Sequence, residues 1–477
     1  MPSHGYTRFK RLPQPRKAVP SQMSRRSVLA AGLALPLVVP RHVLGGAGQQ
    51  APSDTLRIAA VGIGGMGQNY LKGCSTERVV ALCDLDHTLA AKVFDTYPAA
   101  TRYHDFRKMF DKEADNFDAL IIGTPDHTHA VILMAAIKLN KHIYCAKPIT
   151  HSIAEARKVR AALAGAPRLV TKSSVQSSAT DAALNTTELL ASGVIGPIHE
   201  LHIWCDHPAY PCSLVRPTDE QKPPEGMDWD LWLGPAPHRP YHSAYHPAYW
   251  RPWWDFGSGT VGDMACHTLH IAFRQLQLGA PHTVYGCAST RHQGFFQFVS
   301  TPECQSHANT VAWRFGPRGD LPALDVYWYD GGMQPHRPHE LDGGLTLPSS
   351  GLLFVGRDGK LIAGYCGGNP FGRPGRGVSG GLLLPEAKFA DVKQPAPSLP
   401  RCEDHYGEWT RACKTCAKTV CPIEFGCEMT EMALLGALAL RTRRLIEWDA
   451  AAMRITNADD ANRLVDPPAR EGWSLER

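Results

Sequence analysis

The stretch LRIAAVGIGGMGQNYLKGCSTERVVALCDLD, residues 56–86, decides the fold of this chain. It opens with an apolar, β-branched run, Leu56 to Val61, that is typical of a buried parallel strand. The glycines that follow predict a turn into a helix. Gly62 makes the tight turn, Gly64 lets the backbone approach a pyrophosphate, and Gly67 lets the helix pack closely on the strand. The N–H groups at the start of that helix are then placed to bind phosphate.

A second predicted strand, Val79 to Cys83, ends at Asp84, about 20 residues beyond the glycines. An acidic side chain at this point accepts hydrogen bonds from the ribose of NAD and repels the 2′-phosphate of NADP. The stretch therefore predicts a Rossmann fold that binds NAD rather than NADP. The alternative is a Rossmann-like unit whose glycines serve only the turn. The residues predicted here to bind the cofactor are Gly62, Ile63, Gly64, Gly65, Met66, Gly67 and Asp84.

The composition is that of a globular protein with a sizeable core. The chain has 477 residues, of which 43% are hydrophobic and 20% charged, and its length predicts two domains. The formal net charge of +5 includes a basic N-terminal segment that we expect to be removed. Because the rest of the chain is closer to neutral, the charge indicates no nucleic-acid partner.

Residues 1–50 have the pattern of an export signal. Arg25 and Arg26 directly precede an apolar run from Leu29 to Pro40, which is too short to span a bilayer stably. Paired arginines at this position predict export through the twin-arginine machinery, to the periplasm or beyond. The alternative is an uncleaved basic tail or anchor. Since twin-arginine substrates cross the membrane folded, we expect NAD to be tightly bound, carried out with the protein and regenerated in place.

The cysteines raise the question of disulfides, because disulfides form in exported proteins. Of the 14 cysteines, the densest group is Cys413, Cys416, Cys421 and Cys427, with Cys402 upstream. Their spacing matches neither the ferredoxin pattern nor the zinc-ribbon pattern, so we predict no metal centre. A local disulfide and free buried thiols remain as alternatives.

The next predicted strand, Phe117 to Gly123, ends in Thr124-Pro125-Asp126-His127. Ligands of doubly wound sheets bind at the carboxyl ends of the strands. Thr124, Pro125 and His127 are therefore predicted to line the cofactor cleft, although His127 alone also suits a capping role without chemistry.

One strand later, His142 to Cys145 leads into Ala146-Lys147-Pro148. Proline cannot continue a strand, so the chain turns there and presents Lys147 at the same edge of the sheet. Lys147 is thus a candidate both for cofactor contact and for reaching a substrate hydroxyl.

The motifs GIGGMG, CDLD, TPDHTHA, CAKPITH and GDMACH resemble, in this order, those of the Gfo/Idh/MocA family of glucose–fructose oxidoreductases and inositol dehydrogenases. The resemblance runs from about residue 56 to the C-terminus. It implies that Lys147 acts together with an Asp-x-x-x-His pair, here Asp263 and His267, whose spacing places both on one helix face. The sequence departs from the family at two positions. Ala146 stands where the family usually has Glu or Gln, and His270 stands where it often has Asp. His270 is therefore a candidate substrate contact.

The segment from Pro208 to Trp254 is rich in aromatic residues, proline and histidine. One interpretation is a long ordered loop packed by its own aromatic side chains. Aromatic faces beside polar groups also suit the CH faces and hydroxyls of a carbohydrate. We therefore expect Trp250 and Trp254 to contact a sugar substrate.

The predicted fold class is α/β: a doubly wound parallel Rossmann sheet followed by an α+β domain with an open, mostly antiparallel sheet. The Rossmann domain is expected over residues 51–172 and the substrate domain over residues 173–477. The final helix, Met429 to Thr442, and the tail through Trp473 are expected to wrap back over the body. The resemblance also implies a homo-oligomer, because the family commonly pairs through the sheet of its second domain.

The resemblance implies an exported NAD-dependent oxidoreductase that moves a hydride to or from a sugar, inositol or related polyol. In the residue-by-residue comparison, His267 is the base, Lys147 stabilises the charge that develops on the oxygen, and Asp263 orients the histidine or a hydroxyl. One alternative is a glycosidase that oxidises the sugar transiently and regenerates its own NAD. Another is a sugar-binding relative without turnover.

Overall fold

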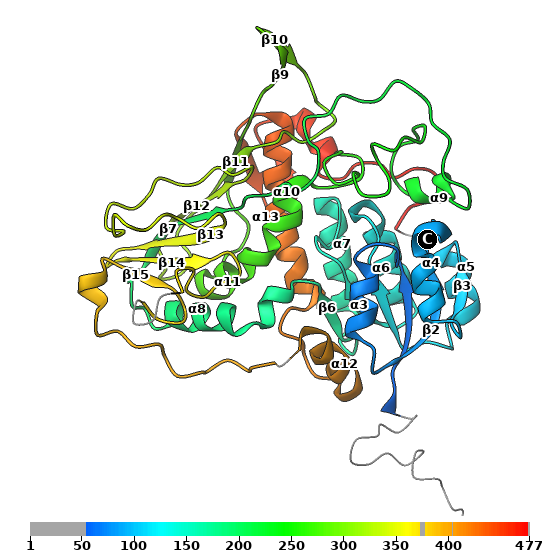
Figure 1. Cartoon of the computed structure of the whole chain (residues 1–477), viewed down its shortest axis with the longest axis horizontal. Coiled ribbons are helices and arrows are strands. Elements are labelled where there is room, and N and C mark those ends of the chain that lie inside the picture. The colour runs from blue at the N-terminus through cyan, green and yellow to red at the C-terminus, as the bar shows by residue number, and fades with distance from the viewer. Residues whose placement is uncertain (1–53, 373–376, 403, 476–477) are drawn as a thin grey trace, which may run out of the picture. The chain divides into compact units, whose positions relative to one another are not determined.

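A computed structural model describes residues 54–372, 377–402 and 404–475. The predicted export signal, residues 1–50 with its arginine pair, lies outside the described residues. Residues Thr55–Arg477 form one unit that contains two β-sheets lying side by side (Figure 1). Every helix in the described ranges falls short, in length or in apolar character, of what a bilayer crossing requires.

The first sheet has six parallel strands in the order β3-β2-β1-β4-β5-β6, the doubly wound Rossmann order. The prediction of this fold is confirmed. The strands are β1 (Arg57–Val61), β2 (Arg78–Cys83), β3 (Thr101–Tyr103), β4 (Ala119–Ile122), β5 (His142–Cys145) and β6 (Thr171–Ser173). The helices around them are α3 (Gly67–Gly73), α4 (His87–Thr96), α5 (Phe106–Glu113), α6 (His129–Lys138) and α7 (Ile153–Ala164), with the short helix η2 (Asp126–Thr128).

Strand β1 is buried on both faces, which explains its unbroken apolar sequence. Ile58 and Ala60 pack in the cluster that includes α3 and α4, whereas Ala59 and Val61 pack in the cluster that includes α5, α6 and α7. Helices therefore cover both sides of the sheet, as a doubly wound fold requires.

The glycines after β1 have the steric roles expected of them. Gly62 has a φ of +76°, a conformation that side chains rarely adopt. A Cβ atom on Gly67 would lie only 2.1 Å from the carbonyl oxygen of Gly62. Helix α3 can thus approach β1 only because position 67 carries no side chain.

The second sheet has nine strands in the order β15-β14-β13-β7-β12-β11-β8-β16-β17. Its pairs are antiparallel except for β7 with β12, so the mostly antiparallel sheet is confirmed. The strands are β7 (Ile198–Trp204), β8 (Thr283–Ala288), β11 (Asn309–Phe315), β12 (Leu324–Tyr329), β13 (Gly351–Gly356), β14 (Lys360–Gly364), β15 (Leu382–Leu384), β16 (Ile446–Asp449) and β17 (Arg454–Ile455). A separate hairpin, β9 (Arg291–Gly294) with β10 (Gln297–Val299), projects from the body (Figure 1).

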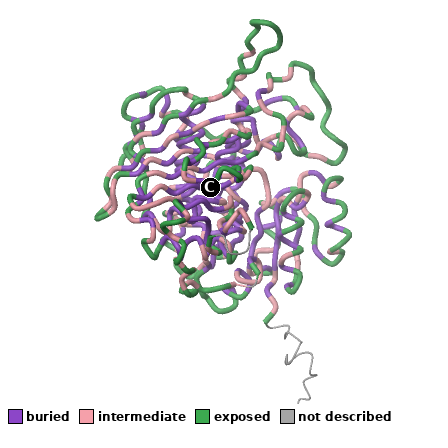
Figure 2. The backbone as a smooth tube through the Cα atoms, turned by 60° about the vertical axis from the view of Figure 1, so that its left-hand side comes forward, coloured by how far each residue is buried: buried purple, intermediate pink, exposed green. Residues whose placement is uncertain are grey.

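Helices cover one face of the second sheet and form the largest apolar cluster with it. Figure 2 shows the buried backbone concentrated in the sheets and in the helices packed on them, while the projecting hairpin is exposed. The helices of this part are α8 (Asp181–Ala191), α9 (Trp229–Leu233), α10 (Gly259–Met264), α11 (Cys266–Leu276), α12 (His405–Thr415) and α13 (Ile423–Thr442), with η3 (Gln176–Ala179), η4 (Glu386–Phe389) and η5 (Asp459–Leu464).

Helix α13 begins at Ile423, six residues before the predicted start at Met429. The prediction omits these first six residues, which overlap the cysteine group. All 14 cysteines are free thiols, so the alternative of a local disulfide is not supported. Cys413, Cys421 and Cys427 are buried and pack in the apolar clusters.

The end of the chain returns to the first sheet. Trp409 of α12 packs against Tyr144 of β5, with ring centres 5.5 Å apart. Trp473 packs on Phe106 and lies beneath the guanidinium of Arg107, 4.6 Å from its ring centre. Residues after 172 thus contribute to the core around the Rossmann sheet.

Candidate active site

A cavity of about 530 Å³ opens at the carboxyl edge of the Rossmann sheet. One part of its wall comes from the loops after β1, β2, β4 and β5. The other part comes from the aromatic segment, from α10 and α11, and from the C-terminal tail. Among the predicted residues that line it are Gly62, Gly65, Met66, Asp84, Thr124, Pro125, Lys147, Trp250, Asp263 and His267.

Asp84 closes the glycine loop from the end of β2. Its Oδ2 accepts the N–H groups of Ile63 and Gly64, each at 2.8 Å, and its Oδ1 accepts the N–H of Asp86 at 3.0 Å. Burial raises the pKa of Asp84, although these amides favour its ionised form. The acidic residue at the end of β2 therefore lies directly against the glycine loop.

The cavity has the features that NAD requires. Gly65 has open space around its Cα, with no atom within 4 Å of the position a Cβ would take. The hydroxyl of Thr124, which lines the wall, is buried and has no hydrogen-bond partner in the described part of the chain. An unpaired donor beside a glycine-lined space and a carboxylate fits a dinucleotide.

Lys147 and Asp263 form the centre of the site. The ammonium of Lys147 binds Oδ1 of Asp263 and donates to its backbone carbonyl at 2.7 Å. Both side chains are largely buried, at 14% and 12% exposure. The resemblance paired these residues from positions more than a hundred residues apart, and the structure brings them together.

Arg251 extends this pair to the Rossmann loop. Its Nε lies 3.2 Å from Oδ2 of Asp263, and its Nη1 lies 3.1 Å from Oδ1 of Asp126. Burial alone would raise the pKa of Asp263, but Arg251 and Lys147 outweigh it and hold that pKa well below the usual range. Asp126 is held in turn by Ser258, whose hydroxyl donates to Oδ2 at 2.7 Å.

His267 lies one helical turn beyond Asp263 and lines the same cavity. Burial and the nearby Lys147 lower its pKa to about 3. With this low pKa the imidazole is neutral at physiological pH. It has no hydrogen-bond partner among the described residues, so its nitrogen lone pair is available to a ligand.

Six predicted site residues lie outside the cavity wall: Ile63, Gly64 and Gly67 of the glycine loop, and His127, Trp254 and His270. His127 is fully buried, with Nε2 2.9 Å from the carbonyl oxygen of Trp232 and Nδ1 3.2 Å from that of Phe256. Burial lowers its pKa to about 4. His127 therefore anchors the aromatic segment instead of binding cofactor, which is the capping alternative.

Trp254 and His270 also require correction as substrate contacts. Trp254 packs in the core of the second sheet, and the guanidinium of Arg441 lies 5.5 Å from its ring centre. His270 is fully buried, with Nε2 3.3 Å from the hydroxyl of Ser177. The aromatic character of Trp254 and the motif position of His270 suggest substrate contact, but the local backbone directs both side chains into the protein.

The aromatic segment largely packs on itself, as the first interpretation held. Trp232, Tyr245, Trp253 and Phe256 form one apolar cluster. Nine of its residues also line the cavity, among them Trp232 of that cluster. Trp250 is another, and its ring centre lies 4.3 Å from the guanidinium carbon of Arg251.

Sequence reasoning missed several residues of the site, above all Arg251 and Asp126. Asp126 lies in the motif TPDHTHA and Arg251 in the aromatic segment, where a charged residue among apolar aromatic residues is a signal of pairing. The cavity wall also includes Tyr70, His207, Tyr210, His246 and Trp473.

The aromatic segment is fixed over the cavity at a second point. His246 donates its Nε2–H to Oδ2 of Asp86 at 3.0 Å, and both side chains are 7% exposed. Asp86 also caps helix α4 by accepting the N–H groups of Thr88 and Leu89. This contact joins the aromatic segment to the start of helix α4, beside the end of β2.

Comparison with known families gives two matches. Residues 56–173 match the oxidoreductase family domain described as an NAD-binding Rossmann fold of the Gfo/Idh/MocA group. Residues 215–283 and 381–475 match the C-terminal α/β domain of the same oxidoreductase family.

Similar curated proteins include an inositol 2-dehydrogenase of Acidothermus cellulolyticus, 28% identical over 35% of this chain and 50% of that protein. Another, from Rubrobacter xylanophilus, is 33% identical over 22% of this chain and 31% of that protein. The chain thus spans a third to a half of the length of these relatives.

Similar solved structures include the WlbA dehydrogenase of Bordetella pertussis with NADH and UDP-GlcNAcA. It has a TM-score of 0.53 and 16% identity, and the match covers 83% of this chain and 99% of that one. The aldose-aldose oxidoreductase of Caulobacter crescentus has a TM-score of 0.53 and 14% identity, with 83% and 100% covered. At this identity the likeness shows a shared fold.

Proposed function

This chain belongs to the Gfo/Idh/MocA oxidoreductase family, and on that basis we propose that it is an NAD-dependent oxidoreductase acting on a CH–OH group of a sugar, inositol or related polyol. The observation that carries the proposal is that one cavity unites the glycine loop and Asp84 with the Lys147–Asp263 pair and His267. Cofactor and substrate groups thus face the same space.

Bound NAD supplies hydride transfer, to or from the carbon that carries the reacting hydroxyl. Gly62, Gly65 and Thr124 would hold its phosphates and nicotinamide end, and Asp84 its ribose. Lys147 lies where its ammonium can donate to the substrate oxygen and stabilise negative charge there. The neutral imidazole of His267 accepts the hydroxyl proton, and Asp263 holds Lys147 in place.

The charges of the site favour a neutral substrate. The positive charges of Lys147 and Arg251 are balanced by the carboxylates of Asp263 and Asp126, which contact them directly. Because no cation of this cluster is left over for an anionic group, the cluster suits an uncharged sugar or polyol better than a sugar acid.

We also propose that the protein is exported by the twin-arginine machinery with NAD tightly bound, and that it is a homo-oligomer. The arginine pair and apolar run of residues 25–40 support export, and family resemblance supports the oligomer. A second candidate activity, redox-assisted cleavage of a glycoside, is favoured by His207, an additional histidine of the cavity wall. The sugar-binding alternative without turnover has less support, because Lys147, Asp263 and His267 line one cavity.

The first experiment denatures the purified protein and measures NAD released per protein by mass spectrometry. Turnover is then followed by NADH absorbance with myo-inositol and with levoglucosan. Lys147→Met is expected to reduce turnover by about 100-fold or more while NADH still binds. Lys158→Met, whose side chain is 44% exposed, is the control. Turnover of Lys147→Met at the wild-type rate would contradict the assignment.

A further inference from the structure

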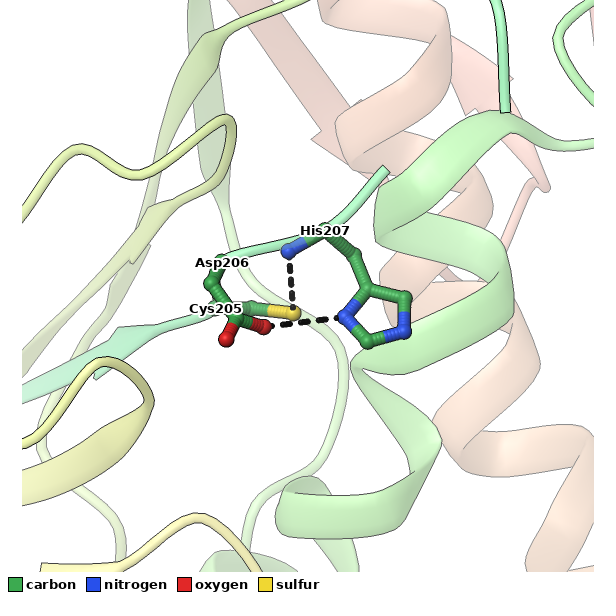
Figure 3. A group of neighbouring side chains, drawn as sticks. All are labelled: Cys205, Asp206 and His207. Atoms are coloured by element: carbon green, nitrogen blue, oxygen red, sulfur yellow. Dashed lines mark hydrogen bonds and ion pairs between the residues drawn. The ribbon is translucent and has the colours of Figure 1, made fainter. Parts of the chain in front are cut away.

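The end of strand β7 carries a compact polar group. Cys205, Asp206 and His207 follow the strand directly, and their thiol, carboxylate and imidazole lie within 4.8 Å of one another (Figure 3). Nδ1 of His207 lies 3.0 Å from Oδ1 of Asp206. Sγ of Cys205 accepts the backbone N–H of His207 at 3.4 Å, and burial raises the pKa of this thiol to about 12. Cys205 is thus a protonated, packed thiol, and the chemically active unit is the Asp206–His207 pair.

The pair is held in place from several sides. The hydroxyl of Ser349 donates to Oδ2 of Asp206 at 3.0 Å, and the N–H of Asp206 donates to the hydroxyl of Ser350 at 3.1 Å. The backbone carbonyl of His207 accepts the N–H of Gly331 at 2.6 Å. A carboxylate fixed beside Nδ1 keeps the proton on that nitrogen and leaves the lone pair on Nε2.

His207 faces the candidate active site. It lines the same cavity as Lys147, Asp263 and His267. Its Nε2 has no hydrogen-bond partner within the described ranges of the chain. Figure 3 shows the imidazole directed away from the β7 strand, toward a neighbouring helix.

A second aspartate–histidine pair in the cavity provides a contrast. His246 also lines the wall and is bonded to Asp86, but its other ring nitrogen, Nδ1, is buried and unpaired. That nitrogen cannot reach a substrate. Among the aspartate–histidine pairs of the described wall, only Asp206–His207 combines an orienting carboxylate with an accessible second nitrogen.

We infer that Asp206 and His207 form a second proton-transfer group, which acts on the substrate carbon next to the carbonyl that oxidation creates. This inference rests on the proposed function, because it requires a carbonyl substrate in the cavity. In the proposed oxidation, His267 accepts the hydroxyl proton of the reacting carbon and Lys147 donates to its oxygen, so a second base must act on a different proton. Oxidation makes the C–H bond on the neighbouring carbon acidic, and this is the next proton that a base can remove.

The proton and the electron pair of the step both remain within the cavity. The Nε2 lone pair of His207 takes the proton from the neighbouring carbon, and the electron pair of that C–H bond becomes the enolate. Asp206 stabilises the imidazolium through Nδ1–H. Return of the proton restores the ketone. When the next carbon bears an oxygen substituent, the enolate electrons instead expel it, and the imidazolium proton protonates the leaving oxygen. The second outcome is elimination, the central step of redox-assisted glycoside cleavage.

The experiment uses the full chain with its NAD and the cyclic ketone obtained by oxidising one hydroxyl of myo-inositol. In D₂O, proton NMR follows deuterium uptake next to the carbonyl above the rate without protein. In parallel, NADH-dependent reduction of the same ketone tests the proposed function. The variants are His207→Gln and Asp206→Asn. His242→Gln is the matched control, because His242 pairs with Asp219 at 3.2 Å but lies outside the cavity wall.

We expect the wild type and His242→Gln to catalyse deuterium uptake. His207→Gln should lose it by about 100-fold or more, and Asp206→Asn by about 10-fold, while both still reduce the ketone. Reduction without uptake in the wild type, or equal uptake in His207→Gln, would overturn the inference. Uptake without reduction would overturn the proposed function and leave the dyad supported. If the wild type shows neither deuterium uptake nor ketone reduction, the result contradicts both the inference and the proposed function.

Discussion

The guanidinium of Arg251 lies against the carboxylate of Asp263, with Nε 3.2 Å from Oδ2. Asp263 also binds Lys147, so one carboxylate holds two cations at the centre of the cavity. Arg251 in turn reaches Asp126 on the Rossmann side. The orientation of Lys147 thus depends on a residue that the sequence motifs do not include.

Replacing Arg251 with Gln leaves Asp126 and Asp263 without their shared cation in a buried site. Loss of one partner of a buried ion pair costs about 3–5 kcal/mol, so thermal unfolding should shift to clearly lower temperature. Activity should fall mainly in kcat, because Asp263 no longer holds Lys147 in one position. The control is Arg216→Gln, whose side chain is 48% exposed and 3.6 Å from Glu303. Equal stability of the two variants would contradict a central role for Arg251.

Replacing Asp84 with Ser removes the carboxylate that we propose to bind the ribose of NAD. NADH binding, measured by fluorescence titration, should weaken by about 10-fold, since hydrogen bonds to charged groups contribute about 1.5–3 kcal/mol. Binding of NADPH should weaken less or improve, because the repulsion of the 2′-phosphate is lost. Asp95→Ser, at an 80% exposed side chain on α4, is expected to change neither affinity. A preference for NADPH in the unaltered protein would refute the role given to Asp84.

Replacing His246 with Gln weakens the contact between the aromatic segment and Asp86. The aromatic segment is then held less firmly against the end of β2, and NADH should dissociate about 10-fold faster in stopped-flow fluorescence. An exposed histidine of the same segment, His238, gives the control variant His238→Gln. If both variants release NADH at the wild-type rate, the contact does not retain the cofactor.

The pair Glu188–Arg401 predicts a pH dependence of stability. Arg401 binds Oε2 of Glu188 at 2.7 Å and lowers the pKa of Glu188 to about 2. Because the folded pKa lies below the unfolded value of 4.5, the unfolded chain binds more protons between these values. This stabilisation is complete above about pH 4.5 and is lost as the pH falls toward 2.

Chemical denaturation at a series of pH values tests this contribution. Glu188→Gln should be less stable than the wild type at neutral pH, and the difference should shrink as the pH falls through that window. Glu428→Gln is the control, because Glu428 binds Arg160 at 2.8 Å with a 38% exposed side chain and should show a much smaller difference. A constant difference for Glu188→Gln at all pH values would contradict the assignment.

The sequence by itself determined the Rossmann half of this protein. Gly62, Gly67 and Asp84 act within one β-turn-α-β unit, so their roles follow from local spacing and from steric limits that the chain carries with it. Lys147 is placed by the proline after it, at the end of a recognisable strand. The mostly antiparallel character of the second sheet was likewise predicted and is confirmed.

Only the tertiary structure decided which side chains meet across the cavity. Asp126 and Arg251 are 125 positions apart, and their contact depends on how the aromatic segment folds back over the sheet. The packing of the second domain also directs the side chains of Trp254 and His270 into the core. Those of Trp250 and His207 line the cavity. Local pattern fixes which element a residue belongs to, but the packing of distant elements fixes where its side chain points, and the chemistry of this site depends on both.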